Sequence, residues 1–191
     1  MKPASTNKLR IIGGNLRGSR LDFPDLPGLR PTSDRIRETL FNWLQGSIRG
    51  SNCLDLFAGS GAVGFEAISR GAEQVCFVEK SELAANTIRE NLQRLKITNA
   101  EVLEEDARES LLRFQIHNQK FDVIFLDPPF SEQLIPSICN QLEESNVMAD
   151  GCKIYIESGE KIDIQNLSPT WVILKEKKAG VVNYCLFAYT K

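Results

Sequence analysis

From about residue 52 onward, short apolar runs alternate along the chain with longer amphipathic stretches. Apolar runs of this length are typical of strands buried on both faces, and apolar positions three and four residues apart are typical of helices. Such alternation predicts βαβ units and a mostly parallel sheet with helices on both faces. The strands are expected at 53–57, 74–79, 101–104, 121–127, 152–158, 171–175 and 184–190, and the helices near 62–70, 82–96, 107–115 and 131–144.

The end of the chain departs from this alternation. The last two expected strands are connected by 177–180, which is too short for a crossover helix, so we expect them to pair antiparallel. The predicted fold class is therefore α/β, a doubly wound, mostly parallel, seven-stranded Rossmann-like sheet that ends in a hairpin.

The first fifty residues follow a different pattern. Two apolar segments, 9–12 and 19–23, flank three glycines, which predicts a β-hairpin with glycine turns. A proline-rich loop follows it. A helix is then expected from the capping residues Thr32 and Ser33 to Gly46, because its apolar residues recur at helical spacing.

Charge is unevenly distributed between these parts. Residues 1–50 hold nine lysines and arginines against four acidic residues, a net charge of +5, whereas the whole chain carries −2. A basic segment on an acidic body is typical of a protein that binds a polyanion, although a solvated charged face is the alternative interpretation. We divide the chain into a basic hairpin arm and loop, 1–31, and a main domain, 32–191.

Composition narrows the class of protein. A chain of 191 residues suits one domain, and it contains neither the apolar stretch of a membrane span nor the apolar core of a signal peptide. The five cysteines form no C-x-x-C pair, and His117 is the one histidine, so we expect no metal site. These features predict a protein of the reducing cytoplasm.

A glycine turn follows the first strand of the main domain. The segment 59–64 matches G-x-G-x-x-G between an expected strand and a helix, where the backbone can approach a ligand closely. Glu79 ends the next strand, where an acid can accept both hydroxyls of a ribose. A dinucleotide oxidoreductase would show the same pattern. Asp55, positioned to attract an ammonium group, and Asp106, positioned to accept from an adenine amino group, favour S-adenosylmethionine.

The fourth strand ends in Asp127-Pro128-Pro129-Phe130. In a doubly wound sheet this end of the strand faces the same crevice as the glycine turn. Asp127 and the carbonyl of Pro128 can accept the two N–H bonds of an exocyclic amine on a base, which draws the nitrogen lone pair out of conjugation. Consecutive prolines fix the direction of that carbonyl, and Phe130 can stack on the base. The segment predicts transfer of a methyl group to an amine.

Together these segments resemble the bacterial 16S rRNA (guanine(966)-N(2))-methyltransferases, the RsmD family. The resemblance covers nearly the whole chain. The segments before residue 43 are specific to the family, whereas the glycine turn and Asp-Pro-Pro-Phe occur in many amino-methyltransferases. The matching segments are 10–14 with Arg17-Gly18, 30–32 with 35–42, 54–61 and 127–130.

The resemblance implies a class I methyltransferase fold, S-adenosylmethionine as cofactor, and one guanine of 16S rRNA as acceptor. We take a monomer as the default and expect no membrane association. A domain this small has little surface for reading RNA sequence by itself, so we expect the small ribosomal subunit or an assembly intermediate as its partner. The expected catalytic residues are Asp127, Pro128, Pro129 and Phe130. The expected cofactor-binding residues are Asp55, Phe57, Gly59, Gly61, Glu79, Asp106 and Ala107. The expected RNA-binding residues are Arg10, Arg17, Arg20, Arg30 and Arg35.

Three other functions fit parts of the pattern. An amino-methyltransferase could act on adenine N6 in DNA or RNA, or on a protein glutamine, because Asp-Pro-Pro-Phe does not separate these acceptors. An NAD-dependent oxidoreductase would explain the glycine turn but has no use for Asp-Pro-Pro-Phe beside its cofactor. A binding module without catalysis would be expected to carry an impaired acceptor site, whereas Asp127 is intact.

Overall fold

The computed structural model describes residues 6–129, 134–162 and 170–190, and within these ranges the chain forms a seven-stranded sheet in the order β5-β4-β3-β6-β7-β9-β8. Strands β3 to β7 are parallel to one another, and β9 and β8 complete the sheet as an antiparallel hairpin, as predicted. The strands are β3 (Asn52–Asp55), β4 (Gln74–Val78), β5 (Ala100–Leu103), β6 (Phe121–Leu126), β7 (Met148–Ser158), β8 (Trp171–Ala179) and β9 (Val182–Tyr189).

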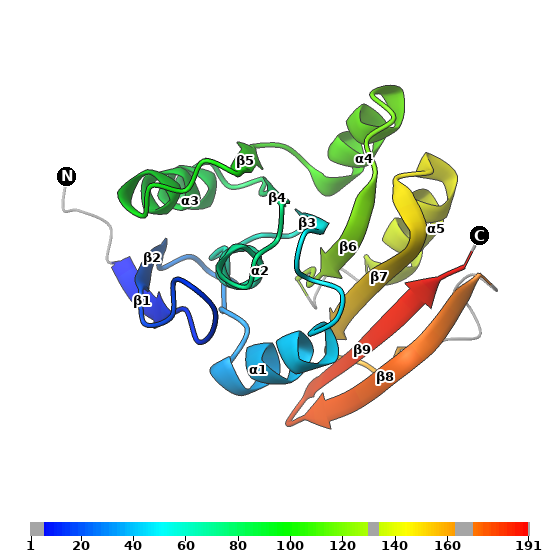
Figure 1. Ribbon diagram of the computed structural model, residues 1–191, viewed down its shortest axis with the longest axis horizontal. Coiled ribbons are helices and arrows are strands. Elements are labelled where there is room, and N and C mark those ends of the chain that lie inside the picture. The colour runs from blue at the N-terminus through cyan, green and yellow to red at the C-terminus, as the bar shows by residue number, and fades with distance from the viewer. Residues whose placement is uncertain (1–5, 130–133, 163–169, 191) are drawn as a thin grey trace.

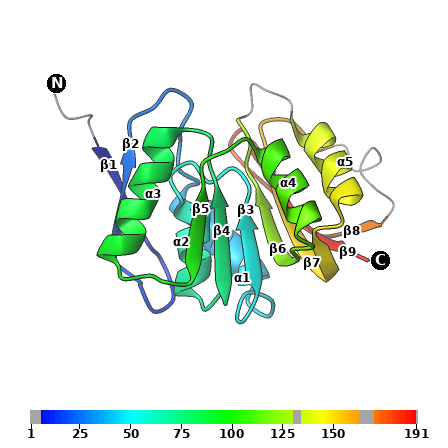
Figure 2. The same cartoon turned by 90° about the horizontal axis from the view of Figure 1, so that it is seen from above.

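Helices cover both faces of the sheet (Figures 1 and 2). One apolar cluster joins α1, α2 and α3 to one face, and a second joins α4 and α5 to the other. Strands buried on both faces account for the near-continuous apolar runs in the sequence. The helices are α1 (Asp34–Trp43), α2 (Ala62–Ser69), α3 (Glu82–Arg94), α4 (Ala107–Ile116) and α5 (Ile135–Ser145). Among the described residues, none of the helices has the length and apolar character that crossing a bilayer requires.

The N-terminal hairpin is a separate two-stranded sheet of β1 (Thr6–Arg10) and β2 (Arg20–Pro24). It packs against α3, where the side chain of Asn91 accepts from the backbone N–H of Asp22 at 3.2 Å and donates to its carbonyl at 2.8 Å. Leu21 is fully buried. The predicted hairpin is therefore present, and its backbone is attached to the main sheet through a covering helix.

A buried charge network also attaches the hairpin to the main domain. Glu66 of α2, which is fully buried, accepts from the backbone N–H of Ile12 at 2.9 Å and from Nε of Arg70 at 2.8 Å. Its carboxylate also pairs with Arg37 of α1 at 3.5 Å. Arg37, 1% exposed, in turn donates to the carbonyl of Arg10 at 2.9 Å. One carboxylate thus joins the hairpin, α1 and α2.

Several element boundaries differ from the sequence prediction. Strand β8 continues to Ala179, because the residues expected to connect the last strands still pair with β9, and the turn lies at Gly180 and Val181. Exposed lysines do not interrupt an edge strand, since strand pairing uses the backbone. Helix α1 ends at Trp43 rather than near Gly46. Strand β7 begins at Met148 rather than at residue 152, with a register shift opposite β6.

The strand order reverses between β3 and β6. From β3 the chain moves outward through β4 and β5, and it then returns to place β6 on the other side of β3. Loops leaving the carboxyl ends of two such strands diverge to opposite faces and leave a crevice between them. The topology therefore sets the position of a ligand site beyond β3 and β6.

Candidate active site

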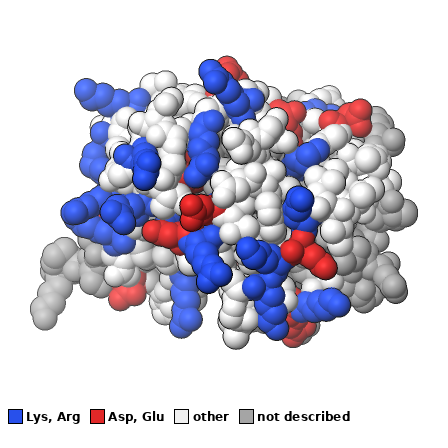
Figure 3. Space-filling view, turned by 60° about the horizontal axis from the view of Figure 1, so that its bottom comes forward, with Lys and Arg blue, Asp and Glu red and all other residues white. Residues whose placement is uncertain are grey.

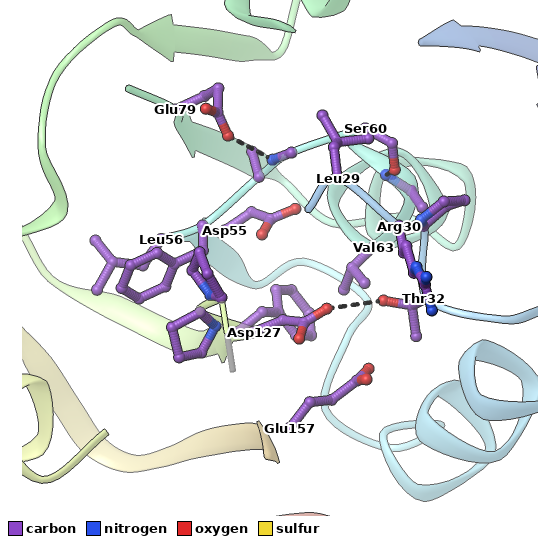
Figure 4. Close-up of a pocket in the computed structure, with 18 of the residues that line it drawn as sticks. Leu29, Arg30, Thr32, Asp55, Leu56, Ser60, Val63, Glu79, Asp127 and Glu157 are labelled. Carbon is purple, nitrogen blue, oxygen red and sulfur yellow. Dashed lines mark hydrogen bonds between the residues drawn. The ribbon is translucent and has the colours of Figure 1, made fainter. Parts of the chain in front are cut away.

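A cavity of about 950 Å³ lies at this point. Its volume is at the upper end of the range for small-molecule sites, which is about 300–1,000 Å³. Figure 4 shows side chains from the ends of several strands and from the loop before α1 converging on it. Most of the predicted site residues line the cavity. They are the cofactor-binding Asp55, Phe57, Gly59, Glu79, Asp106 and Ala107, the catalytic Asp127, Pro128 and Pro129, and the RNA-binding Arg30.

The other predicted residues lie elsewhere. Gly61 is not part of the lining, but it adopts φ +75° at the N-cap of α2, and a Cβ there would come within 2.9 Å of Phe65. Its contribution is therefore to the turn. Arg35 lies on the exposed side of α1, outside the cavity. Phe130 falls outside the described residues.

Glu79 holds the glycine turn in place. One carboxylate oxygen accepts from the N–H of Gly59 at 2.8 Å, and the other accepts from the N–H of Ser81 at 2.8 Å. A carboxylate has about four acceptor positions, so both oxygens remain able to accept from a ligand. Glu79 is thereby fixed in orientation at the edge of the cavity (Figure 4).

Asp55 lies beside the start of α2. It is 4% exposed, and its carboxylate accepts from the N–H of Gly64 in the first turn at 3.0 Å. Burial, with a smaller contribution from the charges of Asp127 and Glu79, raises the pKa of Asp55 to about 7 against the effect of that hydrogen bond. A helix N-terminus usually attracts phosphate through its free N–H groups. Here a carboxylate takes one of them, which disfavours a pyrophosphate at this position.

Asp127 follows β6 and faces the cavity. Its carboxylate accepts from the hydroxyl of Thr32 at 3.2 Å, from the loop before α1 (Figure 4). The surrounding protein excludes water and raises the pKa of Asp127 to about 6, while the hydrogen bond from Thr32 lowers it. A carboxylate with this pKa is ionised at neutral pH and can still take up a proton during a reaction.

Two features of the site were not predicted. Thr32 was expected to be a capping residue, but Ser33 caps α1 and Thr32 contacts Asp127 instead. Glu157, near the end of β7, also lines the cavity. Its place at the carboxyl end of a parallel strand was the signal that could have identified it. Asp106, in contrast, is where it was expected, and it caps α4 by accepting from the N–H of Arg108.

The chain matches a family model described as Conserved hypothetical protein 95 over residues 9–188. It is 44% identical over 188 residues to ribosomal RNA small subunit methyltransferase D of Haemophilus influenzae, covering 97% of this chain and 96% of that protein. The Escherichia coli K12 protein of the same name is 41% identical over 184 residues, covering 96% and 91%. The chain belongs to the RsmD family.

Solved structures agree with this assignment. The fold is that of a putative methyltransferase from Escherichia coli, with a TM-score of 0.84, 40% identity, and coverage of 96% of this chain and 99% of that one. A 16S rRNA N2 G1207 methyltransferase of Thermus thermophilus, solved with AdoMet and guanosine, has a TM-score of 0.71 at 22% identity, covering 98% and 50%. This second likeness extends to the fold alone, which is that of class I methyltransferases.

Proposed function

We propose that this RsmD-family protein transfers a methyl group from S-adenosylmethionine to N2 of one guanine of 16S rRNA, the position 966 in the family name. The observation that carries the proposal is Asp127, held by Thr32 at the rim of a cavity that its carboxylate shares with Asp55. Relatives 41–44% identical along nearly their whole length are named as small-subunit rRNA methyltransferases.

The charge of the cavity supports the choice of cofactor. Asp55, Asp127 and Glu157 come from three neighbouring strands, and their carboxyl groups face one cavity. Buried acids in a group favour a cationic ligand and disfavour an anionic one. S-adenosylmethionine brings a sulfonium and an ammonium group, whereas NAD brings a pyrophosphate. This favours the methyltransferase function over the oxidoreductase.

Each part of the cofactor has a matching residue. We assign the ammonium group to Asp55 and the ribose hydroxyls to Glu79. The adenine belongs beside Asp106 and Ala107, at the start of α4. Bound in this way, the cofactor supplies an electrophilic methyl group.

The acceptor amine belongs at Asp127. Its carboxylate and the carbonyl of Pro128 accept the two N–H bonds of guanine N2, which frees the nitrogen lone pair for attack. As the nitrogen–carbon bond forms and the carbon–sulfur bond breaks, the nitrogen becomes positively charged. Asp127 then accepts one of its protons. Most of the rate enhancement would come from orientation and from this fixed negative charge.

Replacing Glu79 by alanine is expected to raise the dissociation constant for S-adenosylmethionine about 10- to 100-fold. The variant removes charge-assisted hydrogen bonds to the ribose, and the loss of one such bond, about 1.5–3 kcal/mol, already corresponds to this factor. Calorimetric titration would measure the change. Glu82→Ala, at an exposed position in α3, is the matched control. An unchanged dissociation constant would remove Glu79 from the cofactor site.

The pH dependence of methyl transfer should respond to Thr32. Asp127 must be ionised to accept from the amine, so the rate rises with pH through its pKa of about 6. Thr32→Val removes the hydrogen bond that lowers this pKa, so the acid limb of the kcat/KM profile should move to higher pH. Because Thr32 also lowers the pKa of Glu157, the two profiles are compared in a Glu157→Gln background, with Asp55 left intact. Thr39→Val, in α1, is the control, and an unmoved acid limb would contradict the assignment.

A basic groove leads to the cavity. It has a volume of about 490 Å³, is lined by Lys8, Arg10 and Arg20, and shares Pro31 and Thr32 with the cavity. Figure 3 shows lysine and arginine side chains spread over this face and gathered on the side of the N-terminal hairpin. We propose that the hairpin arm and loop, 1–31, bind RNA phosphates, and that the main domain, 32–191, carries out the chemistry. Arg30, at the end of the loop, and Arg35, in α1, would extend the RNA contact toward the main domain.

Charge reversal in the hairpin should weaken RNA binding and flatten its salt dependence. In Arg10→Glu/Arg17→Glu/Arg20→Glu, the slope of log K against log salt should fall by about 0.7–0.9 for each phosphate that the protein no longer neutralises. The lysine triple variant at the same positions keeps the charge and should bind nearly as the parent does. Equal affinity and slope for the glutamate variant would make the hairpin structural.

The experiment that tests the proposed function is methyl transfer from labelled S-adenosylmethionine to small-subunit particles that lack the modification, followed by nucleoside analysis. Label in N2-methylguanosine supports the proposal. Label in N6-methyladenosine, or in a protein, would show that the acceptor is not guanine N2, while methyl transfer to an amine would still hold. Equal rates on naked RNA and on partly assembled particles would contradict our expectation of a particle as substrate.

A further inference from the structure

Glu157 is a buried acid that the proposed function assigns to no particular group of the cofactor or the base. Its side chain is 3% exposed, and it lies near the end of β7 in the wall of the cavity. The hydroxyl of Tyr155 donates to it at 2.8 Å, and the hydroxyl of Thr32 lies within hydrogen-bonding reach. Figure 4 shows its carboxyl group directed toward Thr32, on the side of Asp127 away from Asp55.

This arrangement is costly for the folded protein. Among the described residues, the ion pairs include none to Glu157, and the groups that shift its pKa are hydroxyls and other acids. Burial, together with the charge of Asp127, raises the pKa of Glu157 to about 8. A buried acid without a cation is destabilising. Its presence in a ligand cavity indicates a partner that arrives with the substrate.

The register between β6 and β7 places Glu157 beside Asp127, so this partner must lie next to the group held at Asp127. Strands β6 and β7 are parallel, with Leu126 opposite Ile156, so Asp127 and Glu157 occupy the next pair of positions. Neighbouring strands are about 4.8 Å apart, so the two carboxyl groups can contact adjacent atoms of one base edge. On guanine, the atom beside N2 on that edge is N1, which carries a hydrogen.

We propose that Glu157 is a specificity-determining residue that recognises guanine by accepting a hydrogen bond from its N1–H. The inference rests on the proposed function, because it takes N2 to be held at Asp127. Tyr155 occupies one acceptor position on Glu157 and leaves others for the base. Both the N1–H bond and the cationic cofactor favour the ionised carboxylate, which presents lone pairs only.

Adenine fits this site poorly. With its exocyclic N6 at Asp127, adenine places N1 near Glu157, and that N1 is an acceptor without a hydrogen. Two acceptors would then face each other in a site that excludes water. A protonated Glu157 would donate to adenine N1 instead. Preference for guanine therefore indicates an ionised Glu157, and acceptance of adenine indicates a protonated one.

The test replaces the target guanine of the RNA by 2-aminopurine, which keeps the N2 amine but has no hydrogen on N1. The parent protein should prefer guanine over 2-aminopurine by about 10- to 100-fold in kcat/KM, the discrimination expected for a well-placed base contact. In Glu157→Gln the side-chain amide can donate to N1 of 2-aminopurine, so the preference should fall to a few-fold. Glu157→Ala should lose rate on guanine but not on 2-aminopurine.

Glu160→Gln, at an exposed position three residues along, is the matched control and should keep the parent preference. Thermal unfolding separates a role in recognition from a structural one. The folded-state pKa of Glu157 is raised from 4.5, so this residue costs stability as pH rises from about 4.5 toward 8. Glu157→Gln should therefore raise Tm at pH 8 while the base preference collapses, whereas a structural residue would lower Tm and leave the preference intact.

Failure of this inference differs from failure of the proposed function. If the parent protein forms no N2-methylguanosine, the proposed function is wrong. If it does, and active Glu157→Gln and Glu157→Ala proteins keep the parent preference for guanine over 2-aminopurine, only the role of Glu157 is overturned. Methylation at N6 of an adenine placed at the target, at a rate near that of guanine, would overturn it as well.

Discussion

The Asp127→Ala variant is expected to lose methyl transfer by about 10²- to 10³-fold while it continues to bind S-adenosylmethionine. This loss is typical when one fixed group that stabilises developing charge is removed from an enclosed site. Asp127 accepts from the amine before transfer and faces the positive nitrogen during it, so its contribution is largest in the transition state. Single-turnover rates and cofactor titration on the same protein would measure both quantities.

Asp150→Ala is the matched control for this experiment. Asp150 is exposed near the start of β7, at the opposite end of the strand from Glu157 and the cavity, and its replacement should change neither quantity. If Asp127→Ala turns over at the parent rate, Asp127 does not hold the amine. If cofactor binding falls in parallel with the rate, Asp127 belongs to the cofactor site instead.

The Glu66→Ala variant should lower the free energy of unfolding by about 3–5 kcal/mol. The loss is this large because the variant removes one fully buried carboxylate that three groups share: the buried Arg37, Arg70 and the half-buried N–H of Ile12. For a chain of this size, 1 kcal/mol shifts Tm by about 2–4 °C, so a fall of about 6–20 °C is expected. Urea unfolding at constant pH would give the free energy directly.

Glu73→Ala, at an exposed position, should stay within about 0.5 kcal/mol of the parent. Adding Arg37→Met to Glu66→Ala should recover part of the loss, because without Glu66 the buried Arg37 keeps only the exposed Asp34 as an ion-pair partner. A double variant whose loss equals the sum of the two single losses would show that the pair is not coupled. Because Glu66 joins the hairpin to α1 and α2, Glu66→Ala should also weaken RNA binding.

Much of the fold could be predicted from local sequence. The strands and helices of the main domain follow from apolar periodicity, and the hairpin at 9–23 follows from its glycines. The reversal at β3 and β6 was not visible in these patterns, but the rule for doubly wound sheets located the site once Asp127 was placed after a strand. The end of β8 was predicted too early, because exposed lysines pair through their backbone as well as apolar residues do.

The candidate site divides in the same way. Asp55, Glu79 and Asp127 could be predicted because each ends a strand or lies within one turn of it, so the local pattern fixes its position. Thr32 could not, since it contacts Asp127 across 95 residues. Glu157 could be recognised only as an acid near the end of a strand, because its place beside Asp127 depends on the pairing of β6 with β7. Local periodicity and turn residues determine where strands end, which is why the sequence alone located the glycine turn and Asp127. Strand order and helix packing determine which distant side chains share a cavity, so only the tertiary structure brought Thr32 and Glu157 to Asp127.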